Sequence, residues 1–448
     1  MSSSLSYVYQ GPSVLVQNQT GQEELQLTQF SEIQKSNETC FFWGSIKEPY
    51  ILSRCLIALS KTVQSSFNMS PYEWSQLKDP IVTAGADKVR FEGFSGCAGV
   101  YARVDVLEDG HNGEFPAAGT TNVDFNSPMI TELARTTPKD ELVLSVGKKE
   151  VAIHREGQST VERKVPLPTK WIKGLTTVQH YFAHSSSYLK LNKIQALGFI
   201  RSVPKGKSTQ DHYIIKRGTK VLLSPMKTAN AVVVGGSHRL KLLEPLIPHI
   251  NEMSIYAEQG AQAISIILHF NTINFVFSIS RDAKRGFSGE GAVLQDLLED
   301  VPDQLIKNFD NLSFANQTFN PALLGADYDL NSRSFETLSA QLAAMGMLGF
   351  DLEGNEFFYR RLPFKLRRIM SLNPRLKGVE KLLEERKVEI IRNDGIHVEA
   401  RVDGTGAKHF VSLGPAGDKC TCLWYSQNQG ERGHCKHILA TKKLANAN

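Results

Sequence analysis

The stretch KCTCLWYSQNQGERGHCKHILATKK, residues 419–443, holds three of the six cysteines in the 448-residue chain. Cys420 and Cys422 are separated by one residue, so in an extended strand both thiolates point to the same side. After a gap of twelve residues, Cys435 and His437 repeat this spacing at the start of a helical pattern. Three thiolates and one imidazole suit tetrahedral Zn²⁺, with Zn–S distances of about 2.3 Å. The pattern predicts one zinc ion held by these four residues.

A set of four protein ligands leaves no position for water, so we expect the zinc to be structural and not catalytic. His434 is the competing ligand, but it is adjacent to Cys435, where crowding makes chelation awkward. A disulfide between the two nearest cysteines is the ordinary alternative, and it would be strained across a single intervening residue. The neighbouring basic residues favour the thiolate forms of the cysteines. They are Lys419, Arg432, Lys436, Lys442 and Lys443.

This spacing resembles the SWIM-type zinc finger, whose pattern is Cys-x-Cys, a variable gap, and Cys-x-His. Cys420, Cys422, Cys435 and His437 occupy its four ligand positions. The strand pair expected before the cysteines, and the HILA segment after them, are similar to the strand-strand-helix unit of that family. The motif is specific, but it covers only the C-terminal part of the chain.

Other segments are similar to a bacterial group of SWIM zinc-finger proteins. They are KVRFEGFSGCAGVYARVDVLEDG (88–110), TTNVDFN (120–126), LSVGKKEVAIH (144–154), ERKVPLPTKWIKGL (162–175) and RGFSGEGAVL (285–294). Proteins of that group are typically encoded beside a MoxR-type AAA+ ATPase and a protein with a von Willebrand factor A domain. The resemblance therefore implies these two proteins as partners, which no residue pattern shows by itself.

The chain as a whole predicts a multidomain α+β fold. Its length suggests about two to four domains. The expected parts are a mixed α/β domain at 1–205, a strand-rich domain at 206–330, a helix-hairpin and basic helical segment at 331–385, and the zinc module at 386–448. The first boundary rests on the linker-like KGKS at 205–208. ELVLSVGKKEVAIHREGQSTVERKVPLP, from residue 141, predicts three strands, and the apolar run 263–280 predicts two more.

Residues 335–345 carry an apolar helical stripe, and a hairpin turning at 353–355 follows. A helix before a hairpin is typical of a winged helix and of many other folds. Residues 359–387 then hold ten Lys or Arg against three Glu. This basic segment can contact phosphates, dock to an acidic protein, or form a solvated helix whose long side chains cover apolar surface. The candidate contact residues are Arg360, Arg361, Lys365, Arg367, Arg368, Trp424, Tyr425 and Lys436.

The sequence contains no complete enzyme motif among those considered below. GFSG occurs at 93 and again at 286, but both copies lack the last Gly of the Gly-x-Ser-x-Gly nucleophile motif. The two eight-residue stretches that begin there match at five positions, which leaves a duplication open. His180 and His184 have the spacing of a zinc protease, but Tyr181 stands where the catalytic Glu is needed. We expect no enzyme and no small-molecule substrate; an undetected enzyme would need a deep polar pocket away from the zinc.

Composition is that of an ordinary soluble protein, with 41% hydrophobic and 22% charged residues and a net charge of +5. The N-terminus has no basic segment followed by an apolar core, so we expect no secretory signal and a cytoplasmic protein. No membrane helix is expected, and Cys40, Cys55 and Cys97 are expected to be free thiols. The sequence thus favours a non-enzymatic adaptor that binds other proteins, and the alternative is a protein that binds DNA or RNA.

Overall fold

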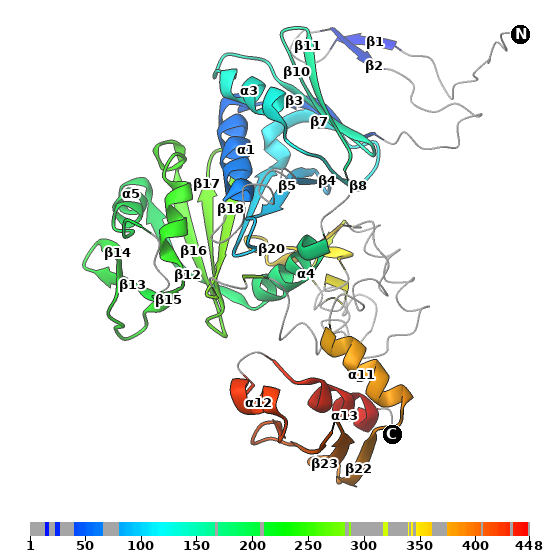
Figure 1. The fold of residues 1–448 in the computed structure, drawn as a ribbon. Coiled ribbons are helices and arrows are strands. Elements are labelled where there is room, and N and C mark those ends of the chain that lie inside the picture. Colours follow the sequence, from blue (N-terminus) through cyan, green and yellow to red (C-terminus); the bar gives the residue numbers. More distant parts are fainter. Residues whose placement is uncertain are drawn as a thin grey trace, which may run out of the picture.

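The computed structural model describes most of the chain as a mixed α+β fold with several antiparallel sheets, as predicted (Figure 1). The described residues are 14–17, 23–26, 40–65, 80–165, 169–206, 210–282, 286–287, 317–320, 339, 342–343, 346–360, 374–404, 406–430 and 433–446. The predicted helix 335–345 lies largely outside them. Within the described residues, no helix is long and apolar enough to cross a membrane.

The largest sheet has eight antiparallel strands in the order β12-β16-β17-β18-β6-β5-β4-β8. Its strands are β4 (Ile81–Gly85), β5 (Lys88–Phe94), β6 (Val100–Val106), β8 (Gly119–Asn122), β12 (Ser185–Asn192), β16 (Glu252–Glu258), β17 (Ala263–His269) and β18 (Ile273–Ser280). Strands β6 and β18 pair at the centre, and the two strands expected within 263–280 are confirmed. The predicted boundary between residues 205 and 206 separates strands that share this one sheet, so it does not divide two independent cores.

One face of this sheet is apolar, and the other carries both apolar and charged side chains. Alternate residues such as Phe91, Val104 and Phe275 enter the main hydrophobic core. Helix α1 (Pro49–Gln64) covers this face with the predicted stripe around Cys55 and Leu56, and Pro49 starts the helix where a missing N–H does no harm. The opposite face carries a network of buried ion pairs, described below.

A five-stranded sheet in the order β11-β10-β9-β3-β7 packs onto the same core. Its strands are β3 (Cys40–Ile46), β7 (His111–Glu114), β9 (Val143–Gly147), β10 (Glu150–Arg155) and β11 (Gln158–Arg163), which confirms the three strands expected after residue 141. The remaining elements of this region are α3 (Ser127–Arg135), α4 (Thr169–Ala183), α5 (Lys193–Arg201) and a sheet of β13 (His212–Arg217), β14 (Lys220–Ser224) and β15 (Val232–Val234). Two further strands, β1 (Val14–Gln17) and β2 (Glu23–Gln26), pair with each other.

The expected hairpin is present as β20 (Leu348–Asp351) and β21 (Glu356–Tyr359), with β19 (Thr318–Phe319) beside β21. Its apolar side chains share a second core with α4. Its turn spans the predicted positions, and Asn355 there adopts a positive φ of 50°. The hairpin and α4 therefore pack together on the face of the large sheet that carries the ion pairs.

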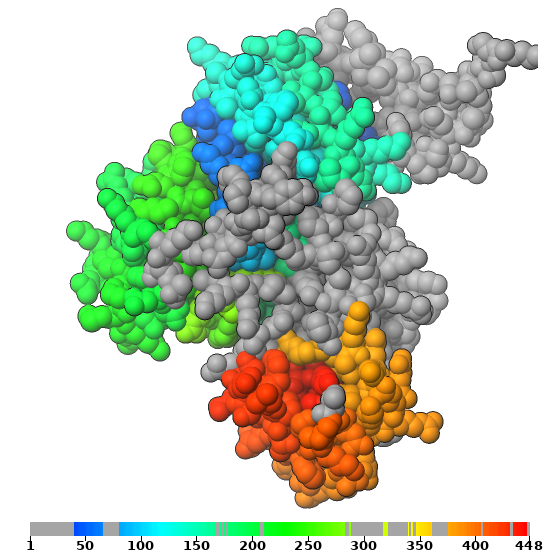
Figure 2. Space-filling view, viewed as in Figure 1, coloured from blue at the N-terminus to red at the C-terminus, as the bar shows by residue number. Residues whose placement is uncertain are grey.

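The C-terminal part folds around a third core. It contains α11 (Pro374–Glu384), β22 (Val388–Asn393), β23 (Val398–Asp403), β24 (Lys408–Leu413), β25 (Lys419–Cys420), α12 (Leu423–Asn428) and α13 (Lys436–Asn446). We call residues 374–446 the C-terminal module; Figure 2 shows it in orange to red as one contiguous lobe. Helix α11 packs against α13, so the predicted boundary between 385 and 386 cuts through this core.

Candidate metal centre

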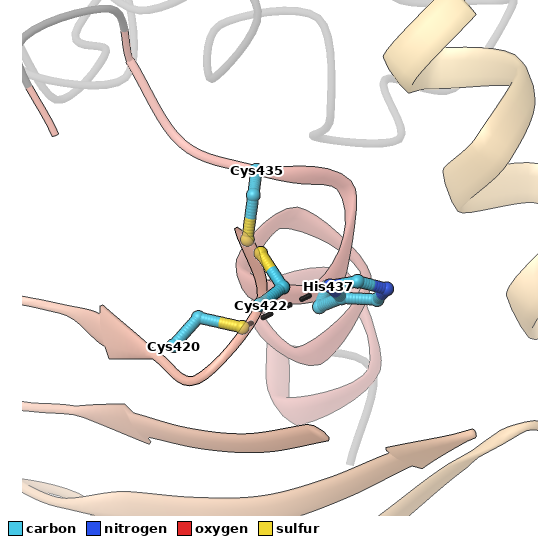
Figure 3. A group of neighbouring side chains, drawn as sticks. All are labelled: Cys420, Cys422, Cys435 and His437. Carbon is cyan, nitrogen blue, oxygen red and sulfur yellow. Dashed lines mark hydrogen bonds between the residues drawn. The ribbon is translucent and has the colours of Figure 1, made fainter. Parts of the chain in front are cut away.

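The four predicted ligands come together at one end of the C-terminal module (Figure 3). Cys420 ends strand β25, Cys422 caps helix α12, Cys435 precedes helix α13, and His437 lies in its first turn. Their ligand atoms all lie within 4.8 Å of one another. The four residues are only 2–6% exposed. Apart from this cluster, the described residues contain no group of three or more potential metal ligands.

Helix ends and hydrogen bonds make the thiols suitable as thiolates. The Tyr425 N–H donates to Cys422 Sγ (3.4 Å), and the Ile438 N–H donates to Cys435 Sγ (3.5 Å). Both sulfurs therefore face the positive N-terminal end of a helix, which stabilises negative charge. The interaction between the thiols of Cys420 and Cys435 lowers the pKa of Cys435 and raises the pKa of Cys420. Binding of a cation to three cysteines requires their thiolate forms and releases their protons.

The histidine assignment agrees with this geometry. His437 Nδ1 lies 3.8 Å from Cys420 Sγ, and Nε2 points away from the sulfurs (Figure 3). His434, the competing ligand, is not part of the cluster. Its Nε2 lies 3.2 Å from the carboxylate of Asp418, which also binds Lys442 at 2.6 Å. His434 therefore ties the loop to β25 and α13, and His437 Nδ1 is the nitrogen placed to bind a metal.

A closed set of three sulfurs and one nitrogen fits a structural ion. Such donor sets bind Zn²⁺ tetrahedrally and leave no site for a reacting water. The buried thiols and the imidazole would otherwise leave polar atoms inside an apolar core that includes Ile438 and Leu439. The residues present therefore fit the predicted cofactor, and an ion bound there would hold the chain together.

Side chains distant in sequence support the ligand loop. Arg375 on α11 donates through Nη1 to the carbonyl of His434 (2.9 Å), and its guanidinium lies over the Trp424 ring (4.9 Å). The His409 ring packs against the His437 ring in a tilted arrangement, with 4.5 Å between ring centroids. Sequence reasoning missed Arg375, Asp418 and His409, because only the folded chain brings them beside the ligands.

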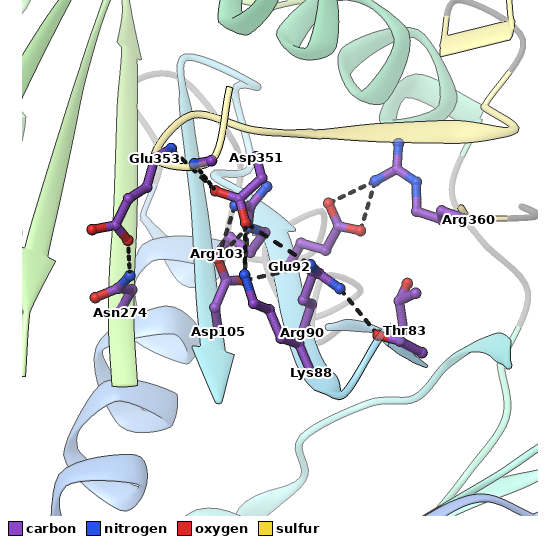
Figure 4. Close-up of polar contacts among 12 residues, drawn as sticks. Thr83, Lys88, Arg90, Glu92, Arg103, Asp105, Asn274, Asp351, Glu353 and Arg360 are labelled. Atoms are coloured by element: carbon purple, nitrogen blue, oxygen red, sulfur yellow. Dashed lines mark hydrogen bonds and ion pairs between the residues drawn. The ribbon is translucent and has the colours of Figure 1, made fainter. Parts of the chain in front are cut away.

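The predicted contact residues have different environments. Trp424 and Tyr425 are half-buried against the core, and Lys436 is half-buried with its side chain passing over Gly378. Arg360 is fully buried, and its Nη1 donates to both carboxylate oxygens of Glu92 at 2.6 and 2.7 Å (Figure 4). The prediction that Arg360 contacts a partner is therefore wrong. Four other predicted contacts lie outside the described residues: Arg361, Lys365, Arg367 and Arg368.

Arg360 belongs to a buried network that joins the hairpin to the large sheet (Figure 4). Arg103 binds Asp105 at 2.8 Å and donates to the carbonyl of Phe350. Burial would raise the pKa of Glu92, but the Arg360 charge and hydrogen bonds outweigh it and lower the pKa. In the network, Arg90, Arg103 and Arg360, with Lys88 at its edge, lie opposite Glu92, Asp105 and Asp351.

The rejected enzyme motifs have structural roles where they are described. Ser95 Oγ accepts a hydrogen bond from the Val100 N–H (3.0 Å), which stabilises the first GFSG turn. Phe287 of the second GFSG donates its N–H to the carbonyl of Ala98 (2.6 Å), so the two motifs meet. Meeting side by side does not decide whether they arose by duplication. The rings of His180 and His184 lie 4.4 Å apart, without a third ligand among the described residues.

Exposed apolar side chains lie close to the ligands in the sequence. Thr421 stands between Cys420 and Cys422, and Leu423 is the first residue of helix α12. Thr421 exchanges hydrogen bonds with the backbone of Phe410 on β24. Phe410 is 56% exposed and Leu423 is 72% exposed. We call Phe410, Thr421 and Leu423 the apolar patch.

Comparisons with known proteins give little further information. No protein-family model and no curated protein match the chain. Among solved structures, the chain is similar to a PCNA2-PCNA3 complex from Sulfolobus tokodaii, with 10% identity over 54% of this chain and 99% of that chain, and a TM-score of 0.39. The Proliferating Cellular Nuclear Antigen from Entamoeba histolytica matches with 10% identity over 54% of this chain and 98% of that chain, and a TM-score of 0.35. Both similarities are too low to support an inference about this chain.

Proposed function

We propose that this chain is a non-enzymatic, cytoplasmic, zinc-binding adaptor of the SWIM type, whose C-terminal module binds another protein. The partners implied by the resemblance are a MoxR-type AAA+ ATPase and a protein with a von Willebrand factor A domain. The observation that carries the proposal is the closed Cys₃His cluster, in which buried protein groups fill all four ligand positions. A metal in such a site stabilises a surface and does no chemistry, so the function lies in what the surface binds.

The apolar patch supports protein binding over nucleic-acid binding. Arg401 on the neighbouring strand β23 pairs with Glu389, and Lys408 on β24 pairs with Asp403, so charges of both signs lie near Phe410. An exposed aromatic and aliphatic pair within a mixed-charge rim is typical of a protein interface. A nucleic-acid site needs an excess of positive charge, and the loss of Arg360 to a buried ion pair reduces the candidates for it.

The metal part of the proposal is tested by metal analysis of the purified full-length chain. We expect about one zinc per chain, and loss of that zinc in Cys422→Ser with unfolding of the module. Cys97→Ser is the matched control, because Cys97 is a half-exposed thiol outside the cluster and its loss should leave the zinc in place. Stoichiometric zinc in a variant that lacks all four ligands would refute the assignment.

The adaptor part is tested by calorimetric titration of the chain with the purified ATPase and with the purified von Willebrand factor A protein. We expect one of them to bind, and Phe410→Ser with Leu423→Ser to weaken binding at least about tenfold, since buried aromatic and aliphatic anchors dominate interface energies. Ile396→Ser is the matched control, because Ile396 is 67% exposed at the other end of the same sheet.

Two outcomes would contradict the adaptor proposal. One is that the protein partner binds the Phe410→Ser, Leu423→Ser variant as tightly as it binds the Ile396→Ser control. The other is no binding to either protein together with tight, strongly salt-dependent binding to a DNA or RNA oligonucleotide, which is the signature of phosphate contacts and would favour the alternative function.

A further inference from the structure

We infer that Arg375 is a positioning residue that couples metal binding to the docking of helix α11, so that the metal controls how α11 is held on the module. This inference rests on the proposed metal site. Helix α11 lies outside the ligand loop, and it is the first described element of the chain after Arg360.

The contacts of α11 with the ligand loop fall beside the ligands. The carbonyl that accepts from Arg375 belongs to His434, the residue before Cys435. The ring under the Arg375 guanidinium belongs to Trp424, two residues after Cys422. Both contacts therefore depend on loop segments whose positions the ligands set.

A third contact of α11 also lies beside the ligands. Gly378 faces the side chain of Lys436, which lies between Cys435 and His437 in the sequence. A Cβ at position 378 would come within 2.9 Å of Lys436 Cδ, so the Lys436 side chain would have to move to admit a larger residue there. The start of α13 is thus held between a ligand pair on one side and α11 on the other.

The apolar face of α11 packs into the same core as the ligands. Leu376, Val379 and Leu382 share this core with Cys420, Cys422 and Cys435 and with the α13 residues Ile438 and Leu439. Without a metal, three thiols and an imidazole have no common centre, and the loop between residues 421 and 436 loses its main constraint. Helix α11 then keeps only apolar contacts with α13, and we expect it to open more often.

Coupling of this kind is reciprocal. If the metal stabilises the docking of α11, the contacts of α11 must strengthen metal binding by the same factor. Groups that orient metal ligands from outside the first shell typically change metal affinity about 10–100-fold. We therefore expect Arg375→Met to lower zinc affinity by about tenfold, since it leaves the ligands themselves intact.

The test is hydrogen exchange of the full-length chain, with zinc and after chelation, followed by mass spectrometry. We expect chelation to raise exchange in peptides from 374–384 as well as in peptides from 420–437, and to leave peptides from 263–280 unchanged. Arg375→Met should raise the hydrogen exchange of α11 when zinc is bound. After chelation, the variant and the unchanged chain should exchange at similar rates. Lys377→Met is the matched control, because Lys377 is exposed on the same helix. Trp424→Leu removes the ring from the other side and should repeat the Arg375→Met result.

Three results would overturn the inference. Exchange of α11 that ignores chelation, while the ligand loop responds, would show that the helix is docked independently of the metal. An equal effect of Arg375→Met with and without zinc would show a merely structural role. If no zinc binds at all, the proposed function fails, and the inference fails with it. The first two results leave the proposed function intact, so the two failures are distinguishable.

Discussion

Loss of the Glu92 carboxylate should destabilise the sheet-hairpin region strongly. Glu92→Gln keeps the size of the side chain but removes the negative charge that Arg360 Nη1 contacts through both carboxylate oxygens. Both residues are fully buried, so water cannot replace the lost charge. Removing one partner of a buried ion pair typically costs about 3–5 kcal/mol, because the other charge stays buried and unpaired.

The network makes the expected cost specific to charge. Three arginines and Lys88 face three carboxylates, and Glu92→Gln removes one of these three negative charges. Glu92 also accepts from the Tyr101 hydroxyl at 2.6 Å, a bond that an amide oxygen can keep. A double variant, Glu92→Gln with Arg360→Met, removes one charge of each sign. It should therefore be more stable than the sum of the two single changes implies, with a coupling energy of about 1–3 kcal/mol.

The assay is urea unfolding followed through hydrogen exchange of the hairpin peptides from 346–360, which reports this region and not the C-terminal module. Arg401→Gln provides the matched control, because Arg401 forms an exposed ion pair with Glu389, and exposed pairs contribute about 0–1 kcal/mol. A Glu92→Gln chain as stable as the Arg401→Gln chain would refute the reasoning, as would a double variant that shows only additive losses.

Three further predictions follow from single features. The ion pairs of the buried network lower the pKa values of Glu92 and Asp351 in the folded chain. The two carboxylates therefore contribute stability above their unfolded pKa values of about 4, and this contribution is lost as the pH falls further. A urea midpoint that stays constant from pH 6 to pH 3 would contradict this prediction. Burial raises the pKa of Cys55, so this thiol should react with a disulfide reagent only after unfolding, which thiol titration with and without denaturant measures. Gly44→Ala should destabilise the chain by about 2 kcal/mol or more in a urea titration. The new Cβ would clash with the backbone of Gly113 on the neighbouring strand. Unchanged stability would show that the two strands can move apart without cost.

Local patterns in the sequence were sufficient wherever one segment decides the structure. The Cys-x-Cys and Cys-x-His spacings predicted which four residues come together, and alternation predicted the strands at 143–163 and 263–280. Domain boundaries were harder, because a linker-like segment such as 205–208 looks the same inside a sheet insertion as between domains. Strand β12 pairs with β16 across about sixty residues, and no local signal reports such a pairing.

The role of Arg360 shows the same limit in one residue. A count of Lys and Arg over 359–387 treats every cation as exposed, but the partner of Arg360 lies 268 residues away in the sequence. Further along the segment, Arg375 also has partners, because it donates to the carbonyl of His434 and lies over the ring of Trp424. Both arginines have structural partners, so a loss of binding after their replacement would report unfolding and not recognition. A fair test of the basic segment therefore substitutes Arg367 and Arg368 and leaves Arg360 and Arg375 in place. If that pair of substitutions leaves both protein binding and oligonucleotide binding unchanged, the basic segment is not the recognition element, and the apolar patch remains the candidate surface.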